Sequence, residues 1–172
     1  LGFSGRIGQT LVVPRRDGVS SVAVGVGTKP DANQLRDAAA AFVRACGRHR
    51  RLALDLSSAW SANRADARAV TEGAILAAYR YPGITAKPDT ASRFDELTVV
   101  SPASRAVETG VRQGAVTARA ATLARDLANT PPAHLNARDI ADLAVSGSVT
   151  GSVSRCSTTT IWSRWGAGDC WG

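Results

Sequence analysis

Short apolar segments alternate with helix-like segments along this chain, and that alternation limits its fold more than any other feature. The strand-like runs are Thr10 to Val13, Ser20 to Val26, Leu52 to Leu56 and Leu97 to Val100. The second run, closed by Gly27, predicts a strand buried on both faces. Because helical segments separate the last three runs, we predict an α/β domain of three layers with a mostly parallel or mixed sheet.

The helix between the second and third runs has clear end signals. Asp31 can cap its N-terminus, and apolar residues such as Leu35, Phe42 and Cys46 then recur at steps of three and four residues. Gly47 ends the helix, because glycine readily adopts the left-handed conformation found after many helices. This spacing places the Cys46 thiol on the apolar face, so we expect it to be buried.

Two further helices are expected before the sequence changes character. The first runs from about Ala65 to Tyr79 and is ended by Pro82 and Gly83, with a polar loop from Lys87 to Arg93 after it. The second runs from about Ser104 to Ala128. A helix of that length spans roughly 37 Å, more than a small sheet needs for cover, so we interpret it as a connecting element.

A double proline and a sudden change of composition follow the long helix. Pro131 and Pro132 end it, because proline cannot continue the helical hydrogen bonds, and a short helix is expected near Asn136. Residues 146–172 are rich in Ser, Thr and Gly and have no regular period, so we expect an irregular, non-native tail. The predicted division is an α/β domain (1–102), a linker helix with the Pro-Pro turn (103–145), and this tail.

The net charge of +7 comes almost entirely from arginine, since Lys29 and Lys87 are the only lysines. Such a charge could hold nucleic acid through phosphate contacts. The arginines are spread along the chain, however, and the dense run Arg48 to Arg51 follows a helix, where cations suit the helix dipole. A small basic module that weakly binds nucleic acid or a nucleotide is therefore kept as the alternative function.

Neither a membrane helix nor a metal site is expected from the residue types present. There is no run of roughly 18 apolar residues and no secretory signal, so the cytoplasm is the expected compartment. The cysteines Cys46, Cys156 and Cys170 form no CxxC pair, and with His49 and His134 they cannot build a four-ligand zinc site. We predict no catalytic, cofactor-binding or metal-binding residue in this chain.

Several residues could carry chemistry but have simpler interpretations. The segment Gly25 to Lys29 follows a strand as phosphate loops do, yet its spacing fits no phosphate motif, so we expect a plain turn. Asp55 is the single carboxylate in an otherwise apolar strand-like run and is interpreted as a cap or edge residue. His134 follows the Pro-Pro turn and is assigned to packing there. Glu72 and Arg80 lie on roughly one helix face and are interpreted as structural.

Two segments resemble the leucyl (cytosol) aminopeptidases. In ATLARDLANTPPAHLNARDIADLA, the positions that match the family's RDLxNTPP turn are Arg125, Asp126, Leu127, Asn129, Thr130, Pro131 and Pro132. In TEGAILAAYRY, the positions that match its EGxxLxxYRF segment are Glu72, Gly73, Leu76, Tyr79 and Arg80. The resemblance covers roughly residues 1 to 145.

The resemblance implies a macro-domain-like α/β fold followed by a long linker helix. In that family a separate C-terminal domain, marked by an NTDAEGRL loop, carries the catalytic lysine and arginine and two divalent ions, zinc or manganese. This chain has no such loop, and its only carboxylates after the Pro-Pro turn are Asp139, Asp142 and Asp169. We therefore expect a fragment that is inactive alone, whose peptide substrates and homohexameric assembly belong to the full-length enzyme.

A shift of reading frame would explain the tail. High Arg and Ala with little Lys suggests a GC-rich gene, and SRCSTTTIWSRWG, back-translated with GC-rich codons and read two nucleotides on, becomes EVLDDDDLVAVG. That product looks like the family's strand after the short helix. The hypothesis places a shift near Leu143 to Val153; a natural truncation with a divergent tail and a pseudogene stay open. The first residue, Leu1, is not methionine, which suggests a missing piece at that end too.

Overall fold

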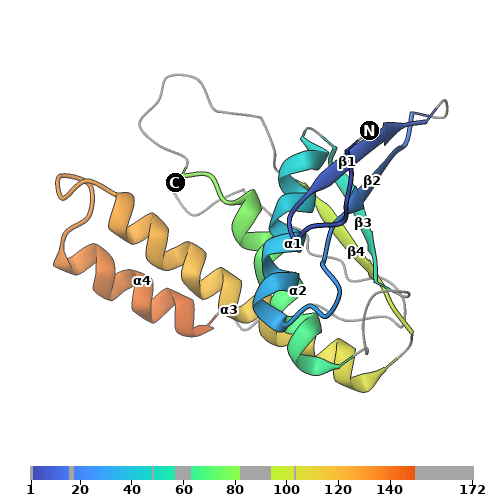
Figure 1. Ribbon diagram of the computed structural model, residues 1–172. Helices are drawn as coiled ribbons and strands as arrows, with labels where there is room; N and C mark the ends of the chain where they lie inside the picture. The colour runs from blue at the N-terminus through green and yellow to red at the C-terminus, as the bar shows by residue number, and fades with distance from the viewer. Residues whose placement is uncertain are drawn as a thin grey trace.

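The computed structural model describes residues 2–15, 18–47, 49–56, 63–81, 94–102 and 104–149. Its elements are β1 (Thr10–Pro14), β2 (Ser20–Val24), α1 (Ala32–Cys46), β3 (Arg51–Asp55), α2 (Arg64–Ala78), β4 (Glu96–Val100), α3 (Arg105–Asn129) and α4 (Ala137–Val149). Figure 1 shows α1 and α2 beside the strands, with the far part of α3 and all of α4 extending away as a helical hairpin. The predicted helix stop at Pro82 and Gly83, the loop 87–93 and the tail from 150 onward lie outside the described residues.

The described strands form two pairs. β1 and β2 are antiparallel, with Thr10 opposite Val24, and β3 and β4 are parallel, with Arg51 opposite Glu96. The parallel pair is connected through α2, as the alternation of strands and helices predicts. The α/β class is therefore confirmed and the strand directions are mixed. Within the described residues, however, β2 and β3 are not hydrogen-bonded to each other, so the two pairs do not form one sheet.

β2 is not buried on both faces, contrary to the prediction. Ser21 and Ala23 are exposed, while Val22 and Val24 are half-buried and pack against the core. Because β2 pairs with β1 and the pair packs on α1, one face of the strand meets the helix and the other meets solvent. This alternation is usual for antiparallel strands. Ser21 and Ala23 are both small residues, so the sequence did not mark one face of this strand as the exposed one.

The ends of α1 are fixed as the sequence predicts. The Gln34 backbone N–H donates to the Asp31 carboxylate at 2.8 Å, and the Asp31 backbone N–H donates to Gln34 Oε1 at 2.9 Å, which forms a capping box. Gly47 follows the last turn with a φ of 56°. Cys46 is 8 % exposed, so the predicted buried thiol is confirmed.

The main core lies between α1, α2 and the β3–β4 pair. Its buried members are Leu35, Ala39, Phe42, Val43, Cys46, Leu52, Leu56, Val70, Ala74, Phe94, Leu97 and Val99. A smaller cluster of Ala67, Val107 and Val111 joins α2 to α3. Burial of these apolar side chains supplies the main favourable term in the free energy of folding. Both clusters include residues of α2, so this helix is shared between them.

Glycines let α2 approach both neighbouring helices closely. A Cβ at Gly73 would lie 2.2 Å from the carbonyl oxygen of Arg36 in α1. A Cβ at Gly110 of α3 would lie 2.3 Å from the carbonyl oxygen of Arg64 in α2, and Gly114 is similarly close to α2. Atoms cannot approach that near, so any side chain at these positions would push the helices apart.

Glu72 is 5 % exposed and carries a charge network across the α1–α2 contact. Arg36 Nη2 of α1 donates to its Oε2 at 2.9 Å, and Arg68 Nε of α2 donates to its Oε1 at 2.8 Å. Burial by itself would raise the pKa of Glu72, but the two guanidinium groups outweigh burial and hold this pKa below its ordinary value. Arg80 is not brought to Glu72, because it lies past the end of α2 and donates to the Tyr79 carbonyl.

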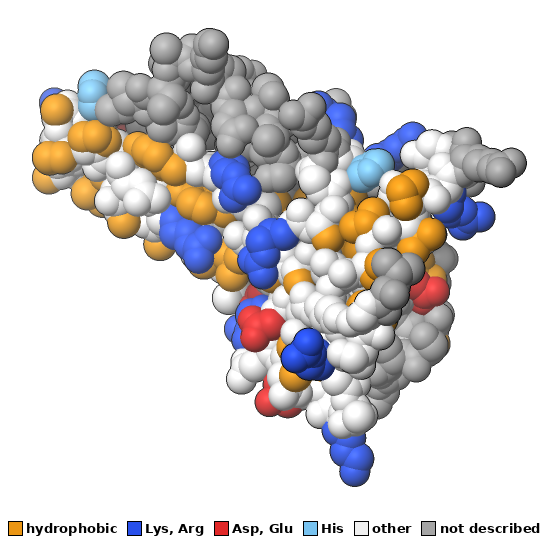
Figure 2. Space-filling model, turned by 45° about the horizontal axis from the view of Figure 1, so that its top comes forward, with side chains coloured by type: hydrophobic (Ala, Val, Ile, Leu, Met, Phe, Trp, Pro, Cys, Tyr) orange, Lys and Arg blue, Asp and Glu red, His pale blue; other side chains and the backbone are white. Residues whose placement is uncertain are grey.

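α3 spans 25 residues, as long as the pattern predicted. Its residues from Val107 to Ala118 include those that are buried against α2, whereas Val116 (66 %) and Leu123 (44 %) on the helix are exposed. After the Pro-Pro turn α4 runs back in roughly the opposite direction and exposes Ile140 (48 %). Figure 2 shows the hydrophobic side chains of this helical arm as an almost continuous band.

α4 begins at the predicted cap and ends later than expected. The side-chain oxygen of Asn136 accepts from the Arg138 backbone N–H at 2.8 Å, which is an N-cap interaction. The helix then continues to Val149, past the boundary at residue 145 that the change of composition suggested. Ser and Gly lower helix propensity by amounts that an existing helix can absorb over its last turn.

Replacing Gly110 with alanine should lower the free energy of unfolding by about 1–3 kcal/mol, because the new methyl group would collide with the Arg64 carbonyl. Helix propensity alone predicts the opposite, a gain of roughly 1 kcal/mol. Urea unfolding measures the difference, with Val116→Ala as a control in the same helix because Val116 is 66 % exposed. Unchanged or higher stability of Gly110→Ala would contradict the close contact.

Glu72→Gln should be less stable than the wild type at neutral pH by about 1–3 kcal/mol, because an amide cannot balance two guanidinium charges. We expect the lower half of that range, because Arg36 is 36 % exposed and water screens its charge. The folded-state pKa of Glu72 is depressed, so its contribution is complete above the unfolded-state pKa and is lost as the pH falls through the folded-state pKa. Urea unfolding at decreasing pH should therefore show the two proteins converging in acid. A constant difference would rule out a role for the charge.

Candidate functional site

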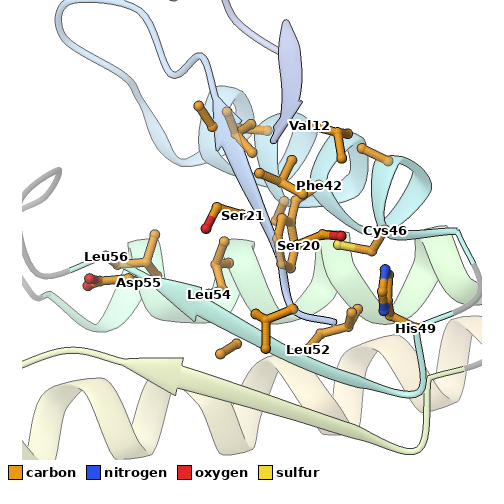
Figure 3. Close-up of a pocket in the computed structure, with 18 of the residues that line it drawn as sticks. Val12, Ser20, Ser21, Phe42, Cys46, His49, Leu52, Leu54, Asp55 and Leu56 are labelled. Atoms are coloured by element: carbon orange, nitrogen blue, oxygen red, sulfur yellow. The ribbon is translucent and has the colours of Figure 1, made fainter. Parts of the chain in front are cut away.

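A cavity of about 920 Å³ opens between the two strand pairs. Side chains of α1, β2 and β3 line it, and Figure 3 shows Phe42 and Cys46 from the helix, Ser20 and Ser21 from β2, and Leu54 from β3 around the same space. Most of the side chains that line the cavity are apolar. The cavity therefore favours an apolar ligand or segment over a highly charged one.

Few groups in the cavity are able to do chemistry. Burial raises the pKa of the Cys46 thiol to about 11, so this sulfur is protonated at neutral pH and is a poor nucleophile. Asp55 ends β3, as expected of an edge residue, and His49 precedes the start of that strand. Figure 3 shows these two side chains at opposite ends of β3, so they do not form an acid–base pair.

The two segments that carry the family-like motifs meet where α2 ends and α3 ends. We call the residues that connect them, Tyr79, Tyr81, Asp126, Asn129 and Thr130, the α2–α3 junction. The Tyr79 hydroxyl donates to Asp126 Oδ1 at 2.8 Å and accepts from Asn129 Nδ2 at 3.3 Å. The Arg125 guanidinium lies 5.3 Å from the centre of the Tyr79 ring, which is a cation–π contact.

Burial raises the pKa of Tyr79. The hydrogen bond from Asn129 and the positive charge of Arg125 lower this pKa, whereas the hydrogen bond to Asp126 and the negative charge of that carboxylate raise it further. The pKa of Tyr79 therefore stays above its ordinary value. The Tyr79 phenol therefore keeps its proton at neutral pH and continues to donate to Asp126. A group held in this way is suited to structural connection and not to proton transfer.

Thr130 completes the junction at the point where α3 stops. Its Oγ1 donates to the Asp126 carbonyl at 2.7 Å, and its backbone N–H donates to the same carbonyl at 3.0 Å. The Tyr81 hydroxyl lies 3.4 Å from Thr130 Oγ1. The chain thus leaves α3 in a direction that the junction fixes, directly before Pro131.

The glycines that could suggest a phosphate loop bond to other parts of the backbone. The Gly25 N–H donates to the Gln9 carbonyl at 2.8 Å, and the Gly27 N–H donates to the Gly5 carbonyl at 3.0 Å. These two N–H groups are therefore occupied within the fold. The segment forms the plain turn that the sequence favoured.

The described residues do not fit the two divalent ions that the family resemblance implies. Among them, no group of three or more His, Cys, Asp or Glu side chains could hold a metal ion. His134 is exposed, and it joins its turn through a backbone hydrogen bond to Pro131 at 2.9 Å and not through its side chain. Asp139 accepts from the Asn136 backbone N–H at 2.8 Å and serves as part of a helix cap. Within the residues that the structure describes, no helix is long and apolar enough to cross a membrane.

Comparison with known proteins identifies a single family. The profile of the cytosol aminopeptidase family, N-terminal domain, matches residues 1–88. The probable cytosol aminopeptidase of Roseiflexus castenholzii is 32 % identical over 157 residues, and that of Rhodococcus jostii is 35 % identical over 158 residues. These matches cover 83 % and 84 % of this chain but 32 % and 30 % of the relatives, so the chain spans about a third of their length.

Solved structures extend the likeness past the residues that the family profile matches. The bottromycin maturation enzyme BotP in complex with Mn is 36 % identical, with a TM-score of 0.70, over 85 % of this chain and 32 % of that enzyme. Another structure of BotP gives a TM-score of 0.71 at the same identity and covers 33 % of that chain.

Tyr79→Phe should lower the free energy of unfolding by about 1 kcal/mol, because Asp126 and Asn129 lose their shared partner. Tyr81→Phe is the matched control and should cost less, since its hydroxyl makes a single long contact of 3.4 Å. Urea unfolding compares the variants, and hydrogen exchange of the last turn of α3 should become faster in Tyr79→Phe alone. Equal effects of the two substitutions would contradict the central place of Tyr79.

Proposed function

Because the chain belongs to the cytosol aminopeptidase family, as the family's N-terminal domain, we propose that it is the non-catalytic part of a metal-dependent leucyl aminopeptidase. The whole enzyme releases N-terminal amino acids, leucine among them, from peptides. The observation that carries the proposal is the α2–α3 junction, in which both family-like motifs meet through Tyr79 and Asp126 at 2.8 Å. The remainder of the longer protein would hold the chemistry.

The metal ions of the whole enzyme would be bound elsewhere in the longer protein. Zinc or manganese would supply an activated water for peptide hydrolysis. The described residues offer no cluster for either ion. The relative BotP has been solved in complex with Mn, which supports a divalent metal in the complete protein.

The chain itself contributes position and packing. The α2–α3 junction ties the end of the linker helix (linker 103–145) to α2 of the α/β domain (1–102), and so sets the direction in which the chain continues past the Pro-Pro turn. The exposed apolar band that includes Val116, Leu123 and Ile140 would be covered by the rest of the enzyme, since such bands mark contact surfaces. We place the complete enzyme in the cytoplasm as a homohexamer.

A nucleic-acid-binding function is less well supported. Arg36 and Arg68 pair with Glu72, and Arg50 pairs with Asp95, so several cations are already engaged within the fold. Figure 2 shows the basic side chains of the visible face as mostly separate spots. Nucleic-acid-binding domains usually gather them into a continuous patch or stripe.

Hydrolysis of leucine p-nitroanilide with added Mn²⁺ or Zn²⁺ tests the proposed function. The chain alone should give no turnover. A chimera in which residues 2–149 replace the matching part of the Rhodococcus jostii protein should be active, with the unmodified parent as the positive control. Turnover by the chain alone would overturn the non-catalytic role. A folded but inactive chimera beside an active parent would show that the chain is not an equivalent domain.

A further inference from the structure

Three arginines form a line along the outer side of α3. Arg105, Arg112 and Arg119 follow one another at steps of seven residues, which is about 20° short of two full turns of a helix. Each arginine therefore lies almost directly above the previous one, about 10.5 Å further along the axis. All three are exposed. The opposite side of the helix faces α2 and carries the buried residues Val107, Gly110, Val111, Gly114 and Ala118.

Exposed apolar side chains lie between these arginines. Val116 and Leu123 come four residues after Arg112 and Arg119, so each is a neighbour on the same side of the helix. Val116 is 66 % exposed and Leu123 is 44 % exposed. We call these two residues and the three arginines the arginine face. A helix face that meets only water usually carries polar residues, whereas arginine mixed with apolar residues is typical of surfaces that contact another protein surface.

The arginine face has an unbalanced positive charge. Within the described residues, the ion pairs of the fold are formed by other arginines, and none includes Arg105, Arg112 or Arg119. α3 has two carboxylates, of which Glu108 lies near this face and Asp126 is engaged at the α2–α3 junction. One glutamate cannot balance three guanidinium groups. A complementary surface must therefore be acidic as well as partly apolar.

α4 does not cover the arginine face. Within the described residues, α4 makes no extended contact with α3, although it runs back in roughly the opposite direction (Figure 1). The 13 residues of α4 rise about 20 Å, which equals the rise of residues 117–129 of α3. The end of α4 therefore lies roughly level with Val116 along α3. Whatever follows α4 in the polypeptide starts at the level of the arginine face and not at the far end of the arm.

We infer that the part of the longer protein that follows α4 covers the arginine face, with carboxylates against Arg112 and Arg119 and apolar side chains against Val116 and Leu123. This inference rests on the proposed function, because the partner is the remainder of the proposed enzyme. The chain spans about a third of the length of its relatives, so the remainder is large enough to provide this cover. A nucleic acid would neutralise the arginines through its phosphates but would leave the apolar side chains without a partner.

Carbodiimide coupling tests this contact, because the reagent joins a lysine amine to a neighbouring carboxylate as an amide. Arg112→Lys and Arg119→Lys are introduced singly into the complete enzyme, and Arg44→Lys, at an exposed position of α1, is the matched control. Lys29 and Lys87 are the only lysines of this chain, so mass spectrometry can assign each new link to the introduced amine. Enzyme assembled from isotope-labelled and unlabelled polypeptides separates links within one polypeptide from links between two copies.

Both α3 variants should form links to aspartate or glutamate residues that follow residue 149 in the same polypeptide, and Arg44→Lys should form none. Arg119→Lys is the sharper probe, because no carboxylate lies within one helical turn of it, whereas Glu108 lies one turn before Arg112. Links to the aspartates of α4 alone would make α4 the partner. Links only between labelled and unlabelled polypeptides would make a second copy the partner, and either result would overturn the inference.

Charge reversal gives a second readout. Arg112→Glu combined with Arg119→Glu should lower the thermal midpoint of the complete enzyme, and the loss should shrink as added salt screens the charges. The same pair should leave the midpoint of the 172-residue chain nearly unchanged, because both side chains are exposed there. Equal shifts in the two proteins would contradict an acidic cover.

Hydrolysis of leucine p-nitroanilide separates the two proposals. If the unmodified complete enzyme does not hydrolyse this substrate with added metal, the proposed function fails. If that enzyme is active but neither α3 variant forms a link beyond residue 149, the proposed function stands and the acidic cover of the arginine face is wrong.

Discussion

The close contact of α2 with α1 on one side and α3 on the other holds the described structure together. Gly73 permits the first contact, and Gly110 and Gly114 permit the second, because a side chain there would meet backbone carbonyls. Glycine inside a helix costs roughly 1 kcal/mol relative to alanine, and tight packing offsets this cost. Glu72 reaches guanidinium groups on two helices, and Tyr79 reaches α3, only because the helices lie this close.

Signals that act over a few residues predicted the elements well. The cap at Asp31, the stop at Gly47 and the end of α3 before Pro131 depend on nearest neighbours, so the sequence displays them directly. The failures involve partners far apart in the chain. Glu72 pairs with Arg36 at a separation of 36 residues, and no periodicity within one segment could have indicated that pair.

The candidate sites show the same difference between local signals, which the sequence displays, and long-range contacts, which it does not. The family-like motifs include Tyr79, Asp126 and Asn129. They did not indicate that Tyr79 and Asp126, 47 residues apart in the chain, form a hydrogen bond of 2.8 Å. The cavity gave no signal at all, because it arises where two strands fail to meet and not from any residue type. The predicted burial of β2 on both faces was wrong for a related reason, since the number of partners of a strand is a property of the sheet.

Because α3 is attached to α2 at Gly110 and again at Asp126, the stretch between those residues tolerates little change in length. One inserted or deleted residue would rotate the far end of the helix by about 100° and shift it by about 1.5 Å, which would carry Asp126 away from Tyr79. A change of about seven residues, close to two full turns, would again turn Asp126 toward Tyr79 but would displace it along the helix axis by about 10 Å. Related chains that diverge freely in sequence should therefore keep the spacing between these two attachments, and insertions should gather in the connections around them.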